Sequence, residues 1–444
     1  MMRRVLPCVI MLICGSRLLA QPSFEEEALQ YLREYLRIDT SNPPGHTLES
    51  ARFLKSILER EGIATTLYES APGSKANLLA RLSATLASDK KPLLLLHHMD
   101  VVPADPARWP LDPFGAILRD GYLWGRGARD MKAHGITHLM TLIRLKRENV
   151  PLDRDVLLLA VADEEIGGGL GAAWMIENHF SQLDPEYVLD EGGFGLQGLL
   201  SADKIVFAVS VAEKRPLWLK LTAQGTAGHG SQPIEDNANQ ILMAALNKIL
   251  SRPGSEGDHP VLREMSRRIG VLPDNKFTRA IRRNTISLTT LSAGVGTPPK
   301  INVIPSVSSA TLDCRLLPDE SPEEFIQQIR STINDPRIEI EVVYQSASQE
   351  SSASETPLFR VIEATLKKHY PQAVVSPVII PYGTDSAQFR RRGVTAYGIL
   401  PVIVTPDIMG SLHGDRERIP LEGFQRGSHI FYEIVLNFLE KEAL

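Results

Sequence analysis

The succession of apolar and polar residues divides the chain into two textures. Residues 93–96 and 155–162 are almost wholly apolar, which is typical of strands buried on both faces of a sheet. Helical periodicity, with apolar residues three or four positions apart, runs through residues 24–38, 46–61 and 129–148. Strands that alternate with helices predict an α/β layer with a mainly parallel sheet.

The texture changes near residue 210. Residues 216–224 alternate apolar and polar side chains, as a half-solvated antiparallel strand does. Residues 252–283 are polar and charged, and we interpret them as an insertion. The other elements predicted in this block are helices at 237–250 and 322–332 and strands at 285–291, 307–316 and 338–344. A helix at 358–369 and a strand at 374–380 then resume the first texture. The sequence predicts one α/β domain interrupted by an inserted α+β domain.

The first twenty of the 444 residues form a separate object. Arg3 and Arg4 precede an apolar run, and the small residue Ala20 follows. The run is too short to span a bilayer. The pattern therefore predicts a secretory signal peptide, residues 1–20, cleaved near Ala20, and hence export to the periplasm or the exterior. A membrane anchor or an unstructured start is the alternative.

Charge and cysteine content narrow the classes of function. The net charge of −5 becomes −8 on cleavage, because three arginines leave with the signal. An acidic chain is a poor candidate for binding nucleic acid or an anionic membrane. Cys314 is the one cysteine outside the signal, so the mature chain is expected to lack an internal disulfide.

Five short segments carry the residue types of a hydrolytic site with paired metal ions. They provide two histidines and at least three carboxylates, the ligand types that zinc accepts in catalytic sites. Each segment alone has an ordinary structural interpretation, and their placement at predicted strand ends is what favours chemistry. The segments are His98-Met99-Asp100, Gly125 to Asp130, Asp163-Glu164-Glu165, Asp190-Glu191 and His413-Gly414-Asp415.

The first two segments suggest a ligand pair. Residues two apart in a strand face the same way, so Asp100 can reach the ring of His98 and fix its tautomer. Asp130 follows a glycine-rich turn, and its two carboxylate oxygens could bridge two metals. The alternative is that Asp130 only caps the helix that follows.

The remaining segments supply further acids and a second histidine. Three adjacent acids repel one another unless cations are present. Glu165 can then bind metal while Glu164 addresses a water molecule, at the carboxyl edge where α/β sheets place their sites. One of Asp190 and Glu191 should be a ligand, and His413 completes the set.

In these segments and in their order the chain resembles the co-catalytic zinc aminoacylase family, which includes acetylornithine deacetylase, succinyl-diaminopimelate desuccinylase, carnosinases and glutamate carboxypeptidases. The resemblance covers nearly all of the mature chain. It implies that His98 binds one zinc, that Asp130 bridges both, and that Glu165 and His413 bind the second. It also implies that Glu164 is the general base and that Asp100 supports His98. Glu191 is the implied remaining ligand, with Asp190 as the fallback.

The same resemblance implies a catalytic domain of residues 21–211 and 349–444 and an inserted lid and dimerisation domain at about residues 212–348. His229, in Ala227-Gly228-His229-Gly230-Ser231, matches the histidine that polarises the scissile carbonyl, often in the partner subunit's site. The positions that match substrate-binding residues are Asn302, Arg315, Gly383 and Thr384. A structural role is the alternative for Asn302 and Arg315.

One departure from the family concerns substrate recognition. Many members have an arginine where this chain has Ala387, and that arginine helps to hold a substrate carboxylate. Arg390, Arg391 and Arg392 lie close, but in a helix we expect them to project elsewhere. Recognition of a free carboxylate is therefore open.

Together these observations predict an exported hydrolase with two divalent metal ions per chain, zinc being the expected metal. It would cleave amide or peptide bonds of small peptides or N-acyl amino acids as a homodimer. The alternatives are a di-zinc aminopeptidase and a non-catalytic zinc-binding protein. Glu164 argues against the latter, because a binding protein has no use for a base beside its ligands.

Overall fold

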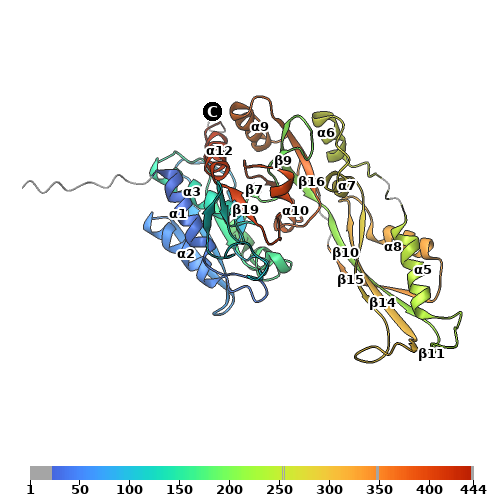
Figure 1. The fold of residues 1–444 in the computed structure, drawn as a ribbon. Coiled ribbons are helices and arrows are strands. Elements are labelled where there is room, and N and C mark those ends of the chain that lie inside the picture. The colour runs from blue at the N-terminus through green and yellow to red at the C-terminus, as the bar shows by residue number, and fades with distance from the viewer. Residues whose placement is uncertain (1–22, 253, 255, 347–349, 442–444) are drawn as a thin grey trace, which may run out of the picture.

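The computed structural model describes residues 23–252, 254, 256–346 and 350–441. The predicted signal peptide lies outside these residues. Within them, no helix combines the length and the apolar character that crossing a membrane requires. Figure 1 shows two bodies: a larger one that contains both the blue and the red parts of the chain, and a narrower one formed by its middle.

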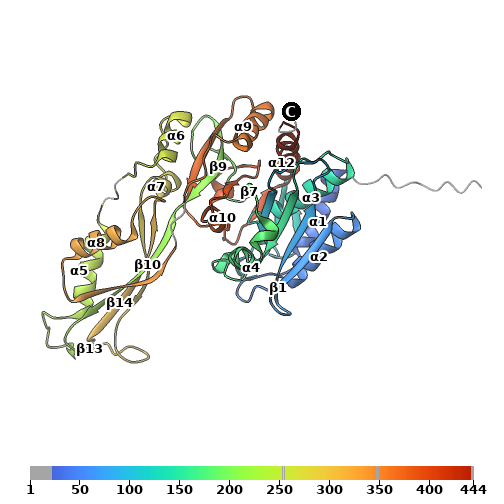
Figure 2. The ribbon, with the colours of Figure 1, turned by 180° about the vertical axis from the view of Figure 1, so that it is seen from behind.

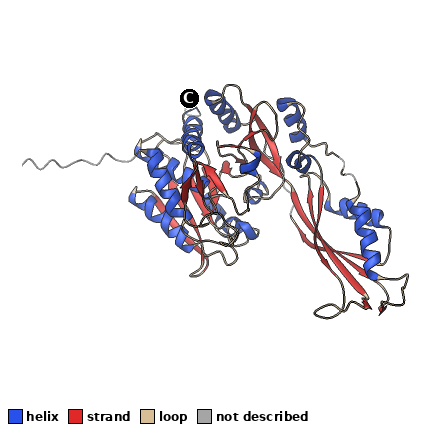
Figure 3. Cartoon of the chain, viewed as in Figure 1, coloured by secondary structure: helices blue, strands red, loops and turns tan. Residues whose placement is uncertain are grey.

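The larger body is built on a ten-stranded sheet between layers of helices (Figure 3). The strand order is β1-β2-β6-β3-β7-β17-β9-β8-β18, and β16 pairs with β9. The central neighbours β6, β3, β7 and β17 run parallel, whereas β1 and β2 form an antiparallel edge. The predicted α/β fold is thereby confirmed.

The strands of the larger body and of its small side sheet β19-β5-β4 are β1 (Ala64–Ala71), β2 (Lys75–Leu82), β3 (Leu93–His98), β4 (Ile117–Arg119), β5 (Tyr122–Trp124), β6 (Val156–Val161), β7 (Tyr187–Asp190), β8 (Gly195–Gln197), β9 (Ile205–Glu213), β16 (Val374–Ile380), β17 (Thr395–Gly398), β18 (Ile403–Val404) and β19 (Arg418–Pro420). Its helices are α1 (Phe24–Leu36), α2 (Leu48–Arg60), α3 (Lys132–Arg147), α4 (Ala172–Leu183), α9 (Pro357–His369), α10 (Ser386–Arg390), α11 (Pro406–Met409) and α12 (Leu421–Lys441), with a short 3₁₀ turn, η1 (Glu164–Ile166).

The apolar runs in the central strands explain the three layers. Side chains alternate between the two faces of a strand, so an uninterrupted apolar run supplies both faces at once. Leu93 and Leu95 belong to the core that includes residues of α1, α3 and α12. Leu94 and Leu96 belong to the core on the opposite face, with residues of α4 and α10.

The smaller body is a four-stranded antiparallel sheet, β12-β14-β10-β15, with helices on one face (Figure 2). In β10, Leu217, Leu219 and Leu221 are buried in its separate core, while Trp218 and Lys220 point to the uncovered face. Its elements are β10 (Arg215–Gln224), β11 (Gly228–His229), α5 (Ala238–Leu250), β12 (Thr285–Ser292), β13 (Val303–Ile304), β14 (Val307–Leu316), α8 (Pro322–Ile333) and β15 (Ile338–Gln345).

The polar stretch within the middle of the chain departs from the prediction of one inserted domain at 212–348. It forms two helices, α6 (Pro260–Ile269) and α7 (Lys276–Arg282), and α6 lies against β16 of the larger body. Met265 and Ile281 join the large core rather than that of the smaller body. The chain therefore returns to the larger body between α5 and β12, because α6 carries its own apolar stripe.

Candidate metal centre

Three adjacent parallel strands bring acidic and histidine side chains to one edge of the sheet. His98 is the last residue of β3, Asp163 to Glu165 follow β6, and Glu191 follows β7. Because the carboxyl ends of neighbouring parallel strands meet, residues far apart in sequence become neighbours here. Two loops complete the cluster by supplying Asp130 and His413.

Asp130 lies between two groups of potential metal ligands. His98 Nε2 is 3.1 Å from Asp130 Oδ1 and 3.7 Å from Glu191 Oε1. His413 Nε2 is 3.0 Å from Asp130 Oδ2 and 3.3 Å from Glu165 Oε2. Within each trio the ligand atoms all lie within 4.8 Å of one another. The two oxygens of Asp130 thus address different trios, as a carboxylate that bridges two metal ions must do.

The electrostatics of the cluster fit a pair of divalent cations. Burial and the charge of Asp130 raise the pKa of Glu165, and the same two causes raise the pKa of Glu191 well above its usual range. Positive charge between these carboxylates would remove both the repulsion and the cost of burying them. Glu165 Oε1 is buried and has no hydrogen-bond partner among the described residues, so it is free to act as a ligand. The donor set of imidazole and carboxylate is the one that zinc accepts.

The histidines show the complementary shifts. Burial alone would lower the pKa of His98, but its hydrogen bonds with Asp100 and Asp130 raise that pKa well above its usual range. Hydrogen bonds with Asp130 and Glu165 raise the pKa of His413 to about 10. Both shifts express the excess negative charge of the site, which favours any bound cation, a proton or a metal ion.

Asp100 holds both His98 and the acidic segment. His98 Nδ1 is 2.9 Å from the Asp100 carbonyl oxygen and 3.6 Å from Asp100 Oδ1. The Asp100 carboxylate accepts hydrogen bonds from the backbone N–H groups of Glu164 and Glu165, each at 3.2 Å, and from the Asn42 side-chain amide at 2.7 Å. Asp100 therefore fixes the imidazole mainly through its carbonyl, while its carboxylate positions the two glutamates.

Glu164 is half-buried and lines the cleft beside the metal-ligand candidates. Burial raises its pKa well above the usual range, and the nearby carboxyls of Asp385 and Glu165 raise it further. A carboxyl group with a raised pKa is suited to taking up and releasing a proton near neutral pH.

The two acids at the end of β7 have different surroundings. Asp190 accepts hydrogen bonds from the backbone N–H of Ser386 at 3.0 Å and from its hydroxyl at 2.7 Å, and so is committed to the start of α10. Glu191 faces His98 instead. A side chain at Gly398 would meet the Glu191 carbonyl at 1.5 Å, so glycine is required for this approach. The geometry favours Glu191 over Asp190 as the ligand.

Glu417 is a functional residue that the sequence did not reveal. Its fully buried carboxylate accepts hydrogen bonds from the backbone N–H groups of Gly127, Arg129 and Asp130, at 3.1, 2.9 and 3.1 Å. It also accepts a hydrogen bond from Arg126 Nη1 at 2.7 Å. Glu417 thus holds the loop that presents Asp130. The one sequence signal was its position four residues after His413.

Asp385 is a second unexpected member of the site. It is buried, lines the cleft, and has one carboxylate oxygen without a hydrogen-bond partner among the described residues. Burial and the charge of Asp190 raise its pKa well above the usual range. The sequence signal for Asp385 is its position directly after Gly383 and Thr384, which match substrate-binding positions of the family.

A cleft of about 720 Å³ opens from the metal-ligand candidates toward the smaller body. Gly383, Thr384 and Arg315, predicted to contact substrate, line it together with Glu164 and His413. Arg315 is held by Asp313, with Nε and Nη2 at 2.8 and 3.1 Å from the carboxylate oxygens. Both bodies therefore contribute to this cleft.

His229 and Asn302 do not reach the cleft within one chain. His229 belongs to β11, which pairs with β13 at the end of the smaller body farthest from the larger one (Figures 1 and 2). Both side chains are exposed, and His229 Nδ1 lies 2.7 Å from the Ser231 hydroxyl. The roles predicted for these residues require a second chain and stay predictions.

The three arginines that follow Ala387 differ in burial and in whether they line the cleft. Arg390 is buried, with Nη1 2.6 Å from Glu213 Oε1, and Arg392 does not line the cleft. Arg391 is exposed, and it lines the cleft together with Ala387 and Gln388. The expectation that all three project elsewhere is wrong for Arg391. It lies four residues after Ala387, so the two share one face of the helical turn.

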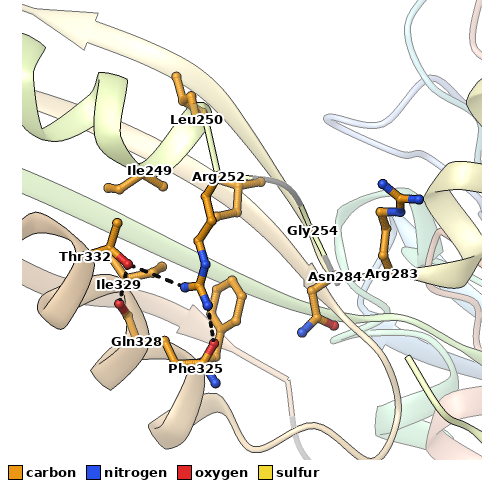
Figure 4. Close-up of a pocket in the computed structure, with 11 residues that line it drawn as sticks. Ile249, Leu250, Arg252, Gly254, Arg283, Asn284, Phe325, Gln328, Ile329 and Thr332 are labelled. Carbon is orange, nitrogen blue, oxygen red and sulfur yellow. Dashed lines mark hydrogen bonds between the residues drawn. The ribbon is translucent and has the colours of Figure 1, made fainter. Parts of the chain in front are cut away.

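A further cavity of about 140 Å³ lies in the smaller body near the end of α5 and α8 (Figure 4). The Arg252 guanidinium crosses it, with its nitrogens 3.3 Å from Gln328 and 3.5 Å from Thr332. No carboxylate or histidine is among its described lining residues. It therefore lacks the chemistry of the cleft.

Comparisons with known proteins agree with the fold. The model of Peptidase family M20/M25/M40 matches residues 94–437. Pig Aminoacylase-1 is 30% identical over 427 residues, which span 95% of this chain and 97% of that protein. Mouse N-fatty-acyl-amino acid synthase/hydrolase PM20D1 is 27% identical over 378 residues, 78% of this chain and 74% of that protein. The structure of the metallo-carboxypeptidase Sso-CP2 from Sulfolobus solfataricus superposes with a TM-score of 0.70 at 20% identity, covering 93% of this chain and 99% of the other.

The fold, the donor set and these relatives define a metal-dependent amidohydrolase. More specifically, the chain belongs to Peptidase family M20/M25/M40, because the family model spans well over half of it. The resemblance inferred from the sequence motifs is thereby confirmed.

Proposed function

We propose that the protein hydrolyses the amide bond of N-acyl amino acids or small peptides with two zinc ions at the cluster around Asp130. The observation that carries this proposal is the division of the two Asp130 oxygens between His98 and His413. In the proposal, His98 and Glu191 hold one ion, Glu165 and His413 hold the other, and Asp130 bridges them. The relatives named as aminoacylases support the substrate class.

When bound, such an ion pair supplies Lewis-acid activation of water and of the scissile carbonyl. Glu164 takes the proton of the attacking water and delivers it to the leaving amine. Asp100 keeps His98 in one orientation and fixes the backbone that carries Glu164. The cleft walls bring the amide to these groups and exclude bulk water, which strengthens every electrostatic interaction inside.

The test combines metal content with the Glu164→Gln variant. We expect about two metals per chain by elemental mass spectrometry. Glu164→Gln should retain them, while kcat falls on the order of 10²–10⁴-fold. Glu177→Gln, a change of the same kind at an exposed position of α4, should leave both quantities unchanged. Near-normal turnover by Glu164→Gln would remove the general base from the mechanism.

We further propose that the chain works as a homodimer in which His229 and Asn302 enter the partner subunit's cleft. Both residues are exposed at the far end of the smaller body, where a histidine would otherwise have no chemical task. His229 would then polarise the scissile carbonyl, as a donor aimed at the developing oxyanion does.

Mixing two inactive variants tests this arrangement. A dimer of one Glu164→Gln chain and one His229→Ala chain contains one site with both native residues, if His229 acts across the interface. Random mixing should restore about a quarter of the wild-type activity. No restoration, in protein shown by light scattering to form mixed dimers, would contradict the proposal.

Arg391 is our candidate for the group that binds the free carboxylate of the substrate. It lines the cleft one helical turn after Ala387, and among the described residues its guanidinium has the neutral Gln388 amide, at 2.8 Å, as its hydrogen-bond partner. A guanidinium without a carboxylate partner can form paired charged hydrogen bonds with a substrate carboxylate.

Export remains part of the proposal and rests on residues 1–20. In a bacterial host that expresses the full chain, the protein outside the cytoplasm should begin close to Gln21. Full-length protein confined to the cytoplasm would contradict cleavage near Ala20.

A further inference from the structure

The uncovered face of the smaller sheet carries a pair of large aromatic side chains at one end, which we call its apolar end. Trp218 on β10 and Tyr344 on β15 are cross-strand neighbours, with ring centroids 4.9 Å apart. Their exposed fractions are 43% and 42%. Farther along the same strands, the residues facing outward are Lys220 and Glu341, whose charged groups lie 3.7 Å apart.

The apolar end faces the cleft. Trp218 and Tyr344 line it together with Pro216, and Ile166 lines it from the larger body. Ile166 follows Glu165 directly and is 55% exposed. Apolar side chains from both bodies therefore flank the candidate metal ligands. Large exposed apolar groups gathered in a concave site are typical of a ligand surface.

We propose that Trp218 and Tyr344 form an aromatic wall that binds the acyl group of the substrate, so that the preferred substrates are amino acids N-acylated with an extended hydrocarbon or aromatic acyl group. This rests on the proposed function, because the amide must lie at the metal centre. Arg391, which directly follows α10 in the larger body, is our candidate for binding the carboxylate on the amine side. The aromatic wall belongs to the smaller body and lines the same cleft.

The chemistry of the wall suits this occupant. Two adjacent aromatic rings present a broad surface that a flexible chain can cover through many small dispersion contacts. Complete burial of one methylene strengthens binding on the order of fourfold, and a one-sided wall provides part of that. Affinity should therefore rise steadily with the length of the acyl chain.

Binding to the Glu164→Gln protein, loaded with its metals, measures this without turnover. The probes are the N-acetyl, N-hexanoyl and N-decanoyl derivatives of leucine, and titration calorimetry gives each Kd. We expect N-decanoyl-leucine to bind at least about tenfold more tightly than N-acetyl-leucine. Equal affinities across the series would overturn the proposal.

Substitutions then assign the effect to the wall. Trp218→Ala and Tyr344→Ala should each reduce the decanoyl-to-acetyl affinity ratio about threefold or more, whereas Trp218→Phe should keep most of it. Leu291→Ala is the matched control, because Leu291 is a 60% exposed apolar residue of the same sheet that does not line the cleft. Its ratio should equal that of the parent protein. Equal ratios in all variants would overturn the assignment.

Two further outcomes separate the possibilities. If Trp218→Ala converts a dimer to a monomer and leaves the decanoyl-to-acetyl affinity ratio intact, the aromatic pair belongs to an interface between chains. The proposal that it binds the acyl group is then overturned. If no acyl amino acid is hydrolysed by the native protein while the chain-length dependence of binding persists, the proposed function fails and the apolar subsite stands.

Discussion

The ion pairs around the candidate metal centre are buried, whereas an ion pair that the smaller body presents to the cleft is half-exposed. In the larger body, the Arg126–Glu417 and Arg390–Glu213 pairs are completely enclosed, and additional hydrogen bonds satisfy their carboxylates. In the smaller body, the Arg315–Asp313 pair keeps more than a quarter of its side-chain surface in solvent. The enclosed ion pairs of the larger body fix the positions of the groups around the candidate metal centre. The smaller body instead presents a solvent-accessible surface to the cleft.

Removing one charge from each kind of pair gives the largest contrast. Glu417→Gln leaves the buried Arg126 guanidinium without a counter-charge, and we expect a loss of about 3–5 kcal/mol in the free energy of unfolding. Asp313→Asn in the smaller body should cost at most about 1 kcal/mol, because water replaces the lost partner. Urea unfolding followed by circular dichroism measures both. Similar losses for the two variants would erase the distinction.

Acid should act on the larger body through buried histidines. Burial lowers the pKa of His134 to about 3 and lowers the pKa of His138 well below 6.5. The unfolded chain binds these protons below about pH 6.5, so their contribution to stability is present above that pH and is lost as the pH falls below it, toward the lowered pKa of each group. Each group contributes a slope of about 1.4 kcal/mol per pH unit in that window.

His138→Phe isolates one of these protons, since the ring at 138 already lies 4.9 Å from Phe431. The slope of unfolding free energy against pH between 6 and 4 should fall by about 1.4 kcal/mol per pH unit relative to wild type. Parallel curves for the two proteins would show that His138 takes up its proton in the folded state. Among the described helices and strands assigned above to the smaller body, His229 is the one histidine, and it is exposed.

The smallest expected effect concerns the place where the two bodies face each other. Arg391→Ala should raise KM for an N-acyl amino acid about tenfold, because one charged hydrogen-bonding partner is lost. The corresponding N-acyl amino acid amide lacks the carboxylate and should show no such increase. Arg392→Ala, the neighbouring exposed arginine outside the cleft lining, serves as the control. An equal increase for acid and amide would assign Arg391 a general role.

The sequence was informative wherever strand ends determine position. His98, Glu165 and Glu191 lie at one edge of the sheet because they stand at or directly after the ends of apolar strands, a feature that the sequence displays. The role of Asp130 could not be predicted from the sequence alone, because an aspartate can either cap a helix or bridge two metal ions. Its approach to both His98 and His413 in the structure favours the bridging role.

Other features depend on contacts that periodicity does not record. The apolar stripe of α6 was hidden among arginines, and its packing on β16 is a tertiary choice. Glu417 acts on backbone N–H groups, which leave no trace in the sequence. Predicting that Arg391 faces the cleft would need the start of α10 to within one residue, because the direction of a side chain rotates by about 100° per residue of a helix.

The hold of Glu417 on the Asp130 loop has a consequence for synthesis. Asp130 and Glu417 are 287 residues apart, and His413 comes only four residues before Glu417. At roughly 5–20 residues per second, a ribosome needs on the order of 15 s to 1 min to traverse that interval. During that time the nascent chain carries Asp130 without Glu417, the residue that holds its loop. In the proposed mechanism the second metal ion would therefore be captured only after His413 has been made, and a chain truncated before residue 413 would be inactive.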